Sequence, residues 1–406
     1  MEKLVITNGK IITPFKIIPR GTVIVTGNKI TAVCEGDVNL NDATVIDAKG
    51  QYVSPGFIDI HVHGGGGYDF MDGDGEGFVK IAELHAKYGT TSMVPTTLTS
   101  EKEHLMKTLD LYEQAHRNNK NGAEFLGLHL EGPYFAMNQR GAQDPRYIRD
   151  PDPEEYHEIL QRADLIARWS AAPERNGAME FGRYLREKNV LAAIAHSDAI
   201  YEEVVEAVEN GYSLSTHLYS GMSGVTRRNA FRYAGVIESS LLMDELDVEI
   251  IADGIHLPAP LLKLIYKVKG PYKIALITDA MRAAGNPPGE YILGNKDTGI
   301  KVIVEDDVAK LPDRSAFAGS VATANRLVQN MVGLADVPLR DAILMMSTTP
   351  ARIMGVQDRK GSLVAGKDAD IVIFDQNIEI QETIIGGRTV YKKPAEGKII
   401  REPFKE

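Results

Sequence analysis

The sequence predicts an α/β protein: a (β/α)₈ barrel of the TIM type, with a small β-sandwich domain formed from both ends of the chain. Three observations support this prediction. From Pro55 onward, eight apolar, strand-like runs alternate with amphipathic, helix-like runs, a pattern typical of parallel strands buried on both faces. Polar side chains stand at the carboxyl ends of several of these strands, as at the catalytic face of a barrel. Short β-branched runs with turn residues occupy both chain ends.

Residues 1–54 are predicted to form the N-terminal part of the β-sandwich domain. Turn signals such as Asn8-Gly9 and Gly27-Asn28 separate β-branched runs, which is typical of hairpins. Strands are expected over residues 4–7, 10–12, 21–26, 29–33 and 43–47. The same texture returns in residues 358–406, in runs such as Ala369–Asp375 and Thr389–Tyr391. We expect this tail to pair with the N-terminal strands and complete the same domain.

Residues 55–357 are predicted to form the barrel. Its strands are expected over residues 56–63, 92–98, 125–131, 165–172, 190–196, 214–218, 248–254 and 274–279. Helices are expected over Gly77–Tyr88 and Tyr201–Glu209, because each pattern is followed by a glycine that can end a helix. Beyond the last strand we expect a loop over 283–291, a strand pair near 299–310, and helices over 320–334 and 339–347. A doubly wound open sheet is the alternative, but the chain lacks the glycine-rich phosphate loop that such a sheet would more naturally carry.

Composition narrows the possible functions. The net charge of −11 argues against a nucleic-acid-binding protein, which would need a basic patch. A single cysteine, Cys34, cannot form an intramolecular disulfide and fits a reducing, cytoplasmic compartment. The first residues resemble a strand and a turn rather than a signal peptide. No apolar run reaches the roughly 18 residues that suggest a membrane span, so we expect no membrane partner.

His61 and His63 stand at the end of the first predicted barrel strand. Residues two apart on a strand point to the same face, and two imidazoles that converge there can hold a divalent metal. The glycines that follow, Gly64–Gly67, permit a sharp turn and leave space above the pair. The alternative is a buried histidine pair bonded to backbone carbonyls.

Other predicted strands also end in possible metal ligands, namely Glu131, His196, His217 and Asp279. An unpaired polar group is unfavourable at such a place, and a shared divalent ion would satisfy the whole set. Taken singly, each residue has another explanation. Glu131 could accept backbone amides in a turn, the two histidines could bond to carbonyls in the core, and Asp279 could cap a helix.

Imidazoles and carboxylates without thiolates suit Zn²⁺ or Fe²⁺, with Mn²⁺ and Co²⁺ as further options. The ligand set exceeds one tetrahedral shell, so either two ions share the site, with Glu131 as a bridge, or one site dominates. A bound metal lowers the pKa of water from about 15.7 to about 7. A carboxylate beside that water, by hypothesis Asp279, can take its proton and return it to a leaving amine. The predicted chemistry is hydrolysis of an amide or another C–N bond.

Several motifs resemble those of a known family. Pro55–His63 is similar to the first-strand signature of the amidohydrolase superfamily. Further motifs resemble N-acetylglucosamine-6-phosphate deacetylases in collinear order, namely Leu130–Tyr134, Ala195–Ser197, Thr216–Tyr219, Ala252–His256, Thr278–Met281, Phe317–Ser320 and Gly366–Val372. The resemblance covers nearly the whole chain.

The resemblance implies a metal-dependent hydrolase that removes acetate from an N-acetyl hexosamine 6-phosphate in amino-sugar catabolism. It implies metal binding by Glu131, His196 and His217, and an acid/base role for Asp279. Some family members lack the His-x-His pair and use one metal, so its presence here favours two. The sugar phosphate is expected to lie among Ala142, Ser220, Gly221, Arg228, His256, Phe317, Ala318 and Gly319. Family members are usually homodimers in which the partner subunit reaches the phosphate. An arginine fork suits phosphate, and whether Arg227 or Arg228 points inward stays open.

Three places differ from the usual family pattern. Gln143 stands where the family usually has a histidine that is thought to polarise the acetyl carbonyl, and glutamine offers only a neutral hydrogen bond. Ser220-Gly221 replaces the usual Asn-Ala, and the segment Arg227–Tyr233 also differs. The alternative hypothesis is therefore the same chemistry on another N-acetylated substrate, such as N-acetylgalactosamine 6-phosphate. A non-catalytic scaffold is a third possibility, which the complete set of ligand positions disfavours.

Overall fold

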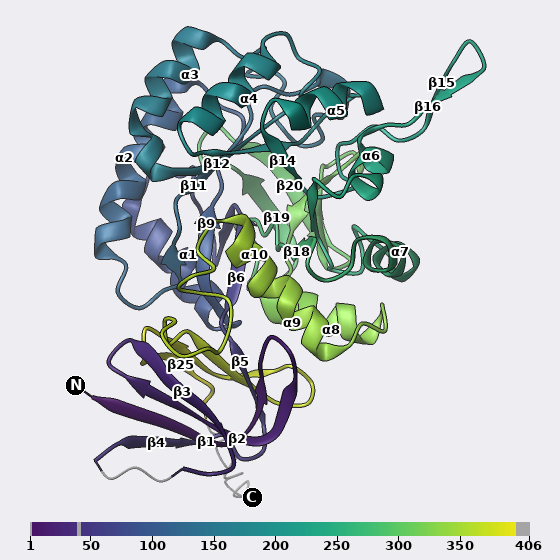
Figure 1. Cartoon of the computed structure of the whole chain (residues 1–406). Helices are drawn as coiled ribbons and strands as arrows, with labels where there is room; N and C mark the ends of the chain where they lie inside the picture. Colours follow the sequence, from purple (N-terminus) through teal and green to yellow (C-terminus); the bar gives the residue numbers. More distant parts are fainter. Residues whose placement is uncertain (1, 39–41, 395–406) are drawn as a thin grey trace, which may run out of the picture.

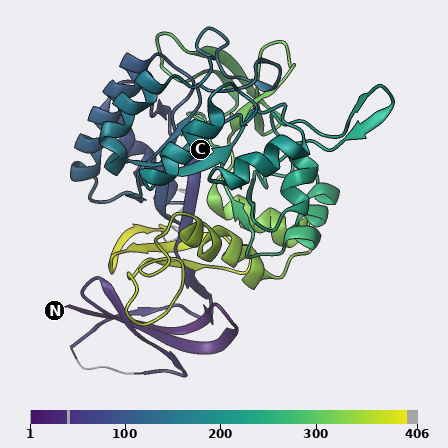
Figure 2. The same ribbon diagram turned by 45° about the horizontal axis from the view of Figure 1, so that its top comes forward.

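The computed structural model describes residues 2–38 and 42–394 and has a mixed α/β architecture (Figure 1). Parts of the predicted β-sandwich ranges, at residues 1, 39–41 and 395–406, lie outside the described residues. A sheet built from both chain ends lies below a larger body of parallel strands and helices (Figure 2). None of the helices in the described ranges has the length and apolar character needed to cross a bilayer.

The lower sheet has the strand order β25-β24-β23-β5-β1-β2-β3, with β4 paired to β1. Strand β5 joins the two chain ends, because it pairs in parallel with β1 and antiparallel with β23. Alternating residues such as Ile6, Val53 and Ile371 form a separate apolar core for this sheet. Its strands are β1 (Lys3–Ile12), β2 (Ile17–Thr26), β3 (Lys29–Glu35), β4 (Thr44–Asp47), β5 (Tyr52–Pro55), β23 (Ile371–Phe374), β24 (Ile380–Ile385) and β25 (Arg388–Lys392).

The upper body contains a curled sheet of parallel strands, as the alternating pattern predicts. Strands β10-β9-β6 form one group and β11-β12-β13-β14-β17-β18 another. Isolated parallel bridges join Thr96, just beyond β9, to His129 of β11, and Val62, at the end of β6, to Ala280, beyond β18. The strands are β6 (Phe57–Val62), β9 (Thr90–Pro95), β10 (Glu124–Phe125), β11 (Leu128–Glu131), β12 (Ile166–Ala171), β13 (Leu191–Ile194), β14 (Tyr212–Ser215), β17 (Asp247–Ile250) and β18 (Ile274–Leu276).

Two details differ from the expected strands. The strand expected over 125–131 is interrupted at Gly127, which adopts a positive φ of 115°. A Cβ at this glycine would lie 2.7 Å from the Cβ of Ala167, so the close approach of the chains requires glycine. In addition, β13, β14 and β18 end before His196, His217 and Asp279, and these residues lie in the loops that follow.

Helices α1–α7 follow the parallel strands and lie mostly around their outer side (Figure 1). Helices α9 and α10 pack against β6 and β18. The helices are α1 (Gly75–Ala86), α2 (Lys102–Asn118), α3 (Pro153–Ile159), α4 (Ala178–Glu187), α5 (Tyr201–Glu209), α6 (Val236–Leu242), α7 (Ala259–Lys269), α8 (Ala324–Gly333), α9 (Leu339–Met346) and α10 (Thr348–Ile353), with 3₁₀ turns η1 (Met137–Gln139) and η2 (Leu160–Leu165).

Small antiparallel elements are inserted between these units. An antiparallel sheet, β19 (Gly289–Leu293), β20 (Ile300–Glu305), β21 (Val308–Lys310) and β22 (Phe317–Ser320), follows β18. A short pair, β7 (Gly64–Gly65) and β8 (Tyr68–Asp69), follows β6. The hairpin of β15 (Thr226–Arg228) and β16 (Phe231–Tyr233) projects from the body as a thin arm (Figure 1), which the turned view also shows (Figure 2).

A buried lysine joins the two sheet systems. Lys360 Nζ lies 2.7 Å from Glu124 of β10, 2.5 Å from Asp370 and 3.3 Å from Asp368. Burial alone would lower the pKa of Lys360, but Asp370 and Glu124 raise it. Arg359 also pairs with Glu124 and Asp368, so the ammonium of Lys360 matters most for the buried Asp370.

We expect Lys360→Met to lower the free energy of unfolding by about 3 kcal/mol, because it leaves the buried Asp370 carboxylate without the cation that pairs with it. Urea unfolding followed by circular dichroism measures the change. Lys263→Met is the matched control, since Lys263 pairs with Asp336 on the surface and such pairs contribute about 1 kcal/mol or less. Equal effects of the two substitutions would contradict the assigned role.

Candidate functional site

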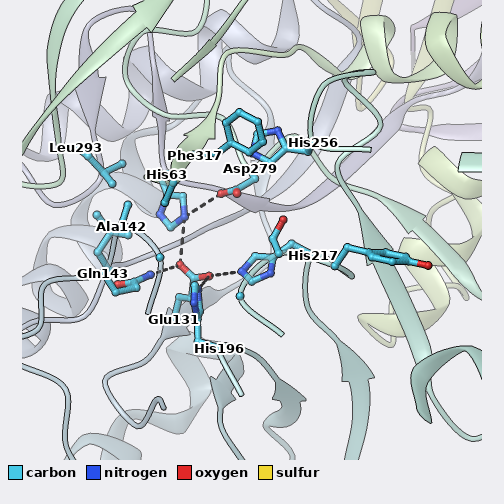
Figure 3. A pocket seen from close by; sticks show the side chains of 17 residues that line it. His63, Glu131, Ala142, Gln143, His196, His217, His256, Asp279, Leu293 and Phe317 are labelled. Atoms are coloured by element: carbon cyan, nitrogen blue, oxygen red, sulfur yellow. Dashed lines mark hydrogen bonds and ion pairs between the residues drawn. The ribbon is translucent and has the colours of Figure 1, made fainter. Parts of the chain in front are cut away.

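Three of the candidate site residues adopt an unusual backbone conformation just beyond their strands. His196, His217 and Asp279 have φ values of 46°, 36° and 49°, in the left-handed region that non-glycine residues seldom occupy. Such conformations are often found at functional sites. Here they turn three side chains toward the space above the parallel strands (Figure 3).

His61 and His63 point to the same face, as their spacing predicts. His61 lies within β6 and His63 directly follows it, and their Nε2 atoms are 3.2 Å apart. Two imidazole nitrogens that face each other need a proton on one of them or a cation between them. The alternative of two histidines bonded only to backbone carbonyls does not fit, although His63 Nδ1 does lie 3.2 Å from the carbonyl oxygen of Thr96.

The Glu131 carboxylate lies at the centre of the cluster (Figure 3). Its oxygens are 2.9 Å from His217 Nε2, 3.3 Å from His63, 3.4 Å from His196 and 3.6 Å from His61. Burial alone would raise the pKa of Glu131, but the imidazoles of His61, His196 and His217 hold it well below its usual range. The carboxylate is therefore ionised at the point where these side chains converge.

Asp279 completes the cluster and lies beside His61 and His63. Its Oδ1 lies 3.1 Å from His63 Nε2 and 3.5 Å from His61 Nε2. Burial would raise the pKa of Asp279, but His61 and His63 lower it. The same two carboxylates raise the pKa of His63 well above its usual value, although burial opposes this. The site therefore has a strong preference for positive charge.

Two groups of side chains have the spacing that a metal ion requires. One consists of His61, His63 and Asp279, and the other of Glu131, His196 and His217. Within each group the possible ligand atoms lie within 4.8 Å of one another, and all six residues are buried. Nitrogen and oxygen donors of this kind suit divalent first-row metals. The donor set, the facing imidazole nitrogens and the preference for positive charge all fit bound divalent ions.

Below the cluster lies a polar network that motif reasoning missed. The Arg168 guanidinium is fully buried and donates to Glu249, and Glu249 Oε2 lies 3.5 Å from His61 Nδ1. Thr278 donates from Oγ1 to Asp59 at 2.5 Å, and burial raises the pKa of Asp59 to about 7. The sequence did contain a hint of this network, because Arg168 and Glu249 carry opposite charges and each stands within a mostly apolar predicted strand.

A cavity of about 290 Å³ opens above the cluster. Of the predicted site residues, it is lined by His63, Glu131, Ala142, Gln143, His196, His217, Ser220, Gly221, His256, Asp279, Phe317 and Gly319. His61 lies buried beneath it, and Ala318 is buried in the apolar core behind β22. Arg228 is not among the lining residues. It lies on the exposed β15–β16 arm, with its guanidinium over the ring of Tyr233.

Gln143 is held in a fixed orientation. Its Nε2 donates to Glu131 Oε2 at 2.8 Å, and its Oε1 accepts from the backbone N–H of Thr99 at 2.9 Å. The side chain thus directs its amide N–H groups toward the carboxylate. On the opposite side of the cavity, His256 Nδ1 lies 2.7 Å from Asp253, and its ring packs on Phe317 with centroids 4.5 Å apart.

Residues 52–390 match the model of the amidohydrolase family. The chain is 35% identical over 395 residues to N-acetylglucosamine-6-phosphate deacetylase of Bacillus subtilis, covering 96% of this chain and 98% of the relative. It is 34% identical over 347 residues to N-acetylgalactosamine-6-phosphate deacetylase of Escherichia coli O157:H7, covering 85% of this chain and 89% of the relative.

Solved structures of deacetylases are also similar to this chain. N-acetylglucosamine-6-phosphate deacetylase of Pasteurella multocida superimposes with a TM-score of 0.89 at 29% identity, over 95% of this chain and 99% of that one. A variant of the Mycobacterium smegmatis enzyme in complex with N-acetyl-D-glucosamine-6-phosphate has a TM-score of 0.87 at 28% identity, over 96% of this chain and all (100%) of that one. This chain therefore belongs to the amidohydrolase family and, within it, to the N-acetylglucosamine-6-phosphate deacetylases.

Proposed function

We propose that this protein hydrolyses N-acetylglucosamine 6-phosphate to acetate and glucosamine 6-phosphate in the cytoplasm, as a step of amino-sugar catabolism. The observation that carries the proposal is the convergence of four imidazoles on Glu131, with Asp279 beside them, at the base of a cavity. The similarity to deacetylases over nearly the whole chain supports the same substrate class.

We assign the two groups of ligands to two divalent ions, Zn²⁺ or Fe²⁺ in preference to Mn²⁺ or Co²⁺. His61 and His63, with Asp279, would hold one ion, and His196 and His217, with Glu131, the other. When bound, such ions lower the pKa of water from about 15.7 to about 7 and polarise a carbonyl oxygen.

We assign the acid/base role to Asp279, and its place at the edge of the cavity supports this assignment. Its carboxylate borders the cavity and is ionised, so it can accept a proton from the attacking water. The water oxygen then bonds to the acetyl carbon, and the proton passes from Asp279 to the amide nitrogen as the C–N bond breaks. Acetate and the free amine result. Gln143 and the two histidine pairs fix Glu131 throughout, so the site needs little rearrangement.

The exposed arm supports a homodimer as the functional form. Arg227 and Arg228 lie outside their own cavity, so we propose that the arm extends to a second copy and brings a guanidinium to the sugar phosphate there. Ala142, Ser220, Gly221, His256, Phe317 and Gly319, which line the cavity, would contact the rest of the sugar phosphate.

We also infer the finer architecture. The parallel bridges between Val62 and Ala280, and between Thr96 and His129, support closure of the curled sheet into a (β/α)₈ barrel over residues 55–357. Residues 1–54 and 358–406 would form the separate β-sandwich domain.

Acetate release from the metal-loaded protein tests the function. We expect turnover of N-acetylglucosamine 6-phosphate, and failure with every divalent metal would refute the proposal. N-acetylgalactosamine 6-phosphate is the second candidate, favoured by Ser220 and Gly221 and by the relative from E. coli. The ratio of kcat/KM values for the two epimers decides between them.

Elemental analysis tests the metal assignment. We expect two divalent ions per wild-type chain, and one per chain in the His61→Ala/His63→Ala variant, since Glu131, His196 and His217 remain. The matched control is His104→Ala, a histidine outside both groups, which should keep two ions. Loss of both ions, or of neither, from the double variant would contradict the assignment.

Mixing two impaired variants tests the roles of Asp279 and the arm together. Asp279→Asn should lower kcat by about 10²–10⁴-fold, and Arg227→Ala/Arg228→Ala should also reduce activity. After mixing under conditions that exchange subunits, we expect activity to return. Each mixed dimer then has one cavity with an intact Asp279 and an intact arm from its neighbour. Absence of recovery would mean that the arm acts on its own cavity or not at all.

A further inference from the structure

A partition of four residues, three of them apolar, separates the cavity above Glu131 from a second, smaller cavity. The first has a volume of about 290 Å³ and the second of about 60 Å³. Four residues line both: Leu98, Ala142, Gln143 and Leu293. Leu98 follows β9, Leu293 ends β19, and the other two lie in the loop after η1.

The residues of the partition are held in place by packing against neighbouring apolar side chains. Leu98 and Ala142 pack against an apolar cluster that includes Leu293 and Val302. Behind Leu98 the backbone comes so close that a Cβ on Gly294 would lie 3.1 Å from Leu98 Cδ1. The Leu98 side chain therefore lies between the two cavities in close contact with its neighbours, and we expect its truncation to join them.

The second cavity is lined by apolar and polar residues, and several of its polar groups already have partners. His104 engages both ring nitrogens, one 3.1 Å from Ser100 Oγ and the other 3.2 Å from the carbonyl oxygen of Met71. Asn295 donates to the same carbonyl at 3.0 Å. Asp144, which also lines the cavity, pairs with Arg146, whereas the buried Thr99 Oγ1 has no partner in the described residues. Because the charged group is already paired and only one buried hydroxyl is left over, the cavity suits an alkyl chain better than a charged group.

The residues that line the main cavity favour one orientation of a bound substrate. Ala142, Gln143 and Leu293 lie on one side of Glu131, and His217 and His256 on the other (Figure 3). An N-acylated amino-sugar phosphate has one apolar end, the alkyl part of its acyl group. With its amide carbon near Glu131 and Asp279, burial of that end is most favourable against the apolar side.

On the basis of the proposed function, we propose that Leu98, with Leu293, sets the length of the acyl chain that this enzyme removes. The partition leaves room for the acetyl methyl group but not for further carbons. The cavity behind it would accommodate an acyl chain one or two carbons longer once the partition is opened. Leu98 is thus a specificity-determining residue that acts by steric exclusion.

The test compares hydrolysis of the N-formyl, N-acetyl, N-propanoyl and N-butanoyl derivatives of glucosamine 6-phosphate by the wild-type protein and by Leu98→Ala. For the wild type we expect kcat/KM to fall on the order of tenfold or more for each carbon beyond acetyl. For Leu98→Ala the ratio of butanoyl to acetyl kcat/KM should rise by at least about tenfold.

Two further variants distinguish a specific effect of the partition on chain-length preference from a general loss of packing. Val302→Ala removes methyl groups from the same apolar cluster but borders neither cavity, so it should lower thermal stability without changing the chain-length preference. Ala142→Val narrows the main cavity from the same side and should shift the preference from acetyl toward formyl. This second variant decides the question if Leu98→Ala does not fold.

The outcomes separate the two proposals. Hydrolysis of the acetyl compound with an unchanged chain-length preference in both Leu98→Ala and Ala142→Val overturns the role of the partition and leaves the proposed function intact. An equal shift in Val302→Ala also overturns it, because general loosening would then explain the effect. No hydrolysis of the acetyl compound by the wild type overturns the proposed function and the partition's role with it.

Discussion

One buried carboxylate, Glu131, governs the arrangement of the candidate site. A carboxylate removed from water is costly unless opposite charge or hydrogen-bond donors surround it. Here four imidazoles approach it from three places in the chain, on or just after β6, β13 and β14. Each of these segments must therefore reach the same depth in the molecule. The curled parallel sheet meets this requirement, because its strands all end at one edge.

The site consists of a base, formed by residues on the parallel strands, and a wall, formed by loops and inserted strands. Beneath the imidazoles, Arg168 and Glu249 pair in the interior, and Asp59 binds Thr278, so the strands are tied together by polar contacts as well as by packing. The cavity wall comes instead from loops and inserted strands, which carry Gln143, Leu293 and Phe317. Under the proposed function, the chemistry would rest on the strand ends, and the choice of substrate on segments that can change without disturbing them.

Local patterns predicted a large part of this structure, and the unpredicted parts depend on contacts between distant segments. The alternation of apolar and amphipathic runs predicted the parallel strands, and the spacing of His61 and His63 predicted that both rings face one side. The position of Asp279 beside that pair could be anticipated only by assuming that the strands converge. The partnership of Arg168 with Glu249 and the closure of the cavity by Leu98 and Leu293 carry no local signature, because neither spacing nor composition relates those residues. The arm that carries Arg228 was expected near the phosphate, and a single chain holds it away from its own cavity.

The sheet shared by the two chain ends has a consequence for biosynthesis. Strand β5 is made early, yet its neighbour β23 leaves the ribosome only after the whole parallel body has been translated. Until then β5 exposes an unpaired edge, a form of structure that invites association with other strands. Nascent chains should therefore depend on chaperone protection late in translation. The final step of folding should be the docking of β23, β24 and β25 onto the N-terminal strands.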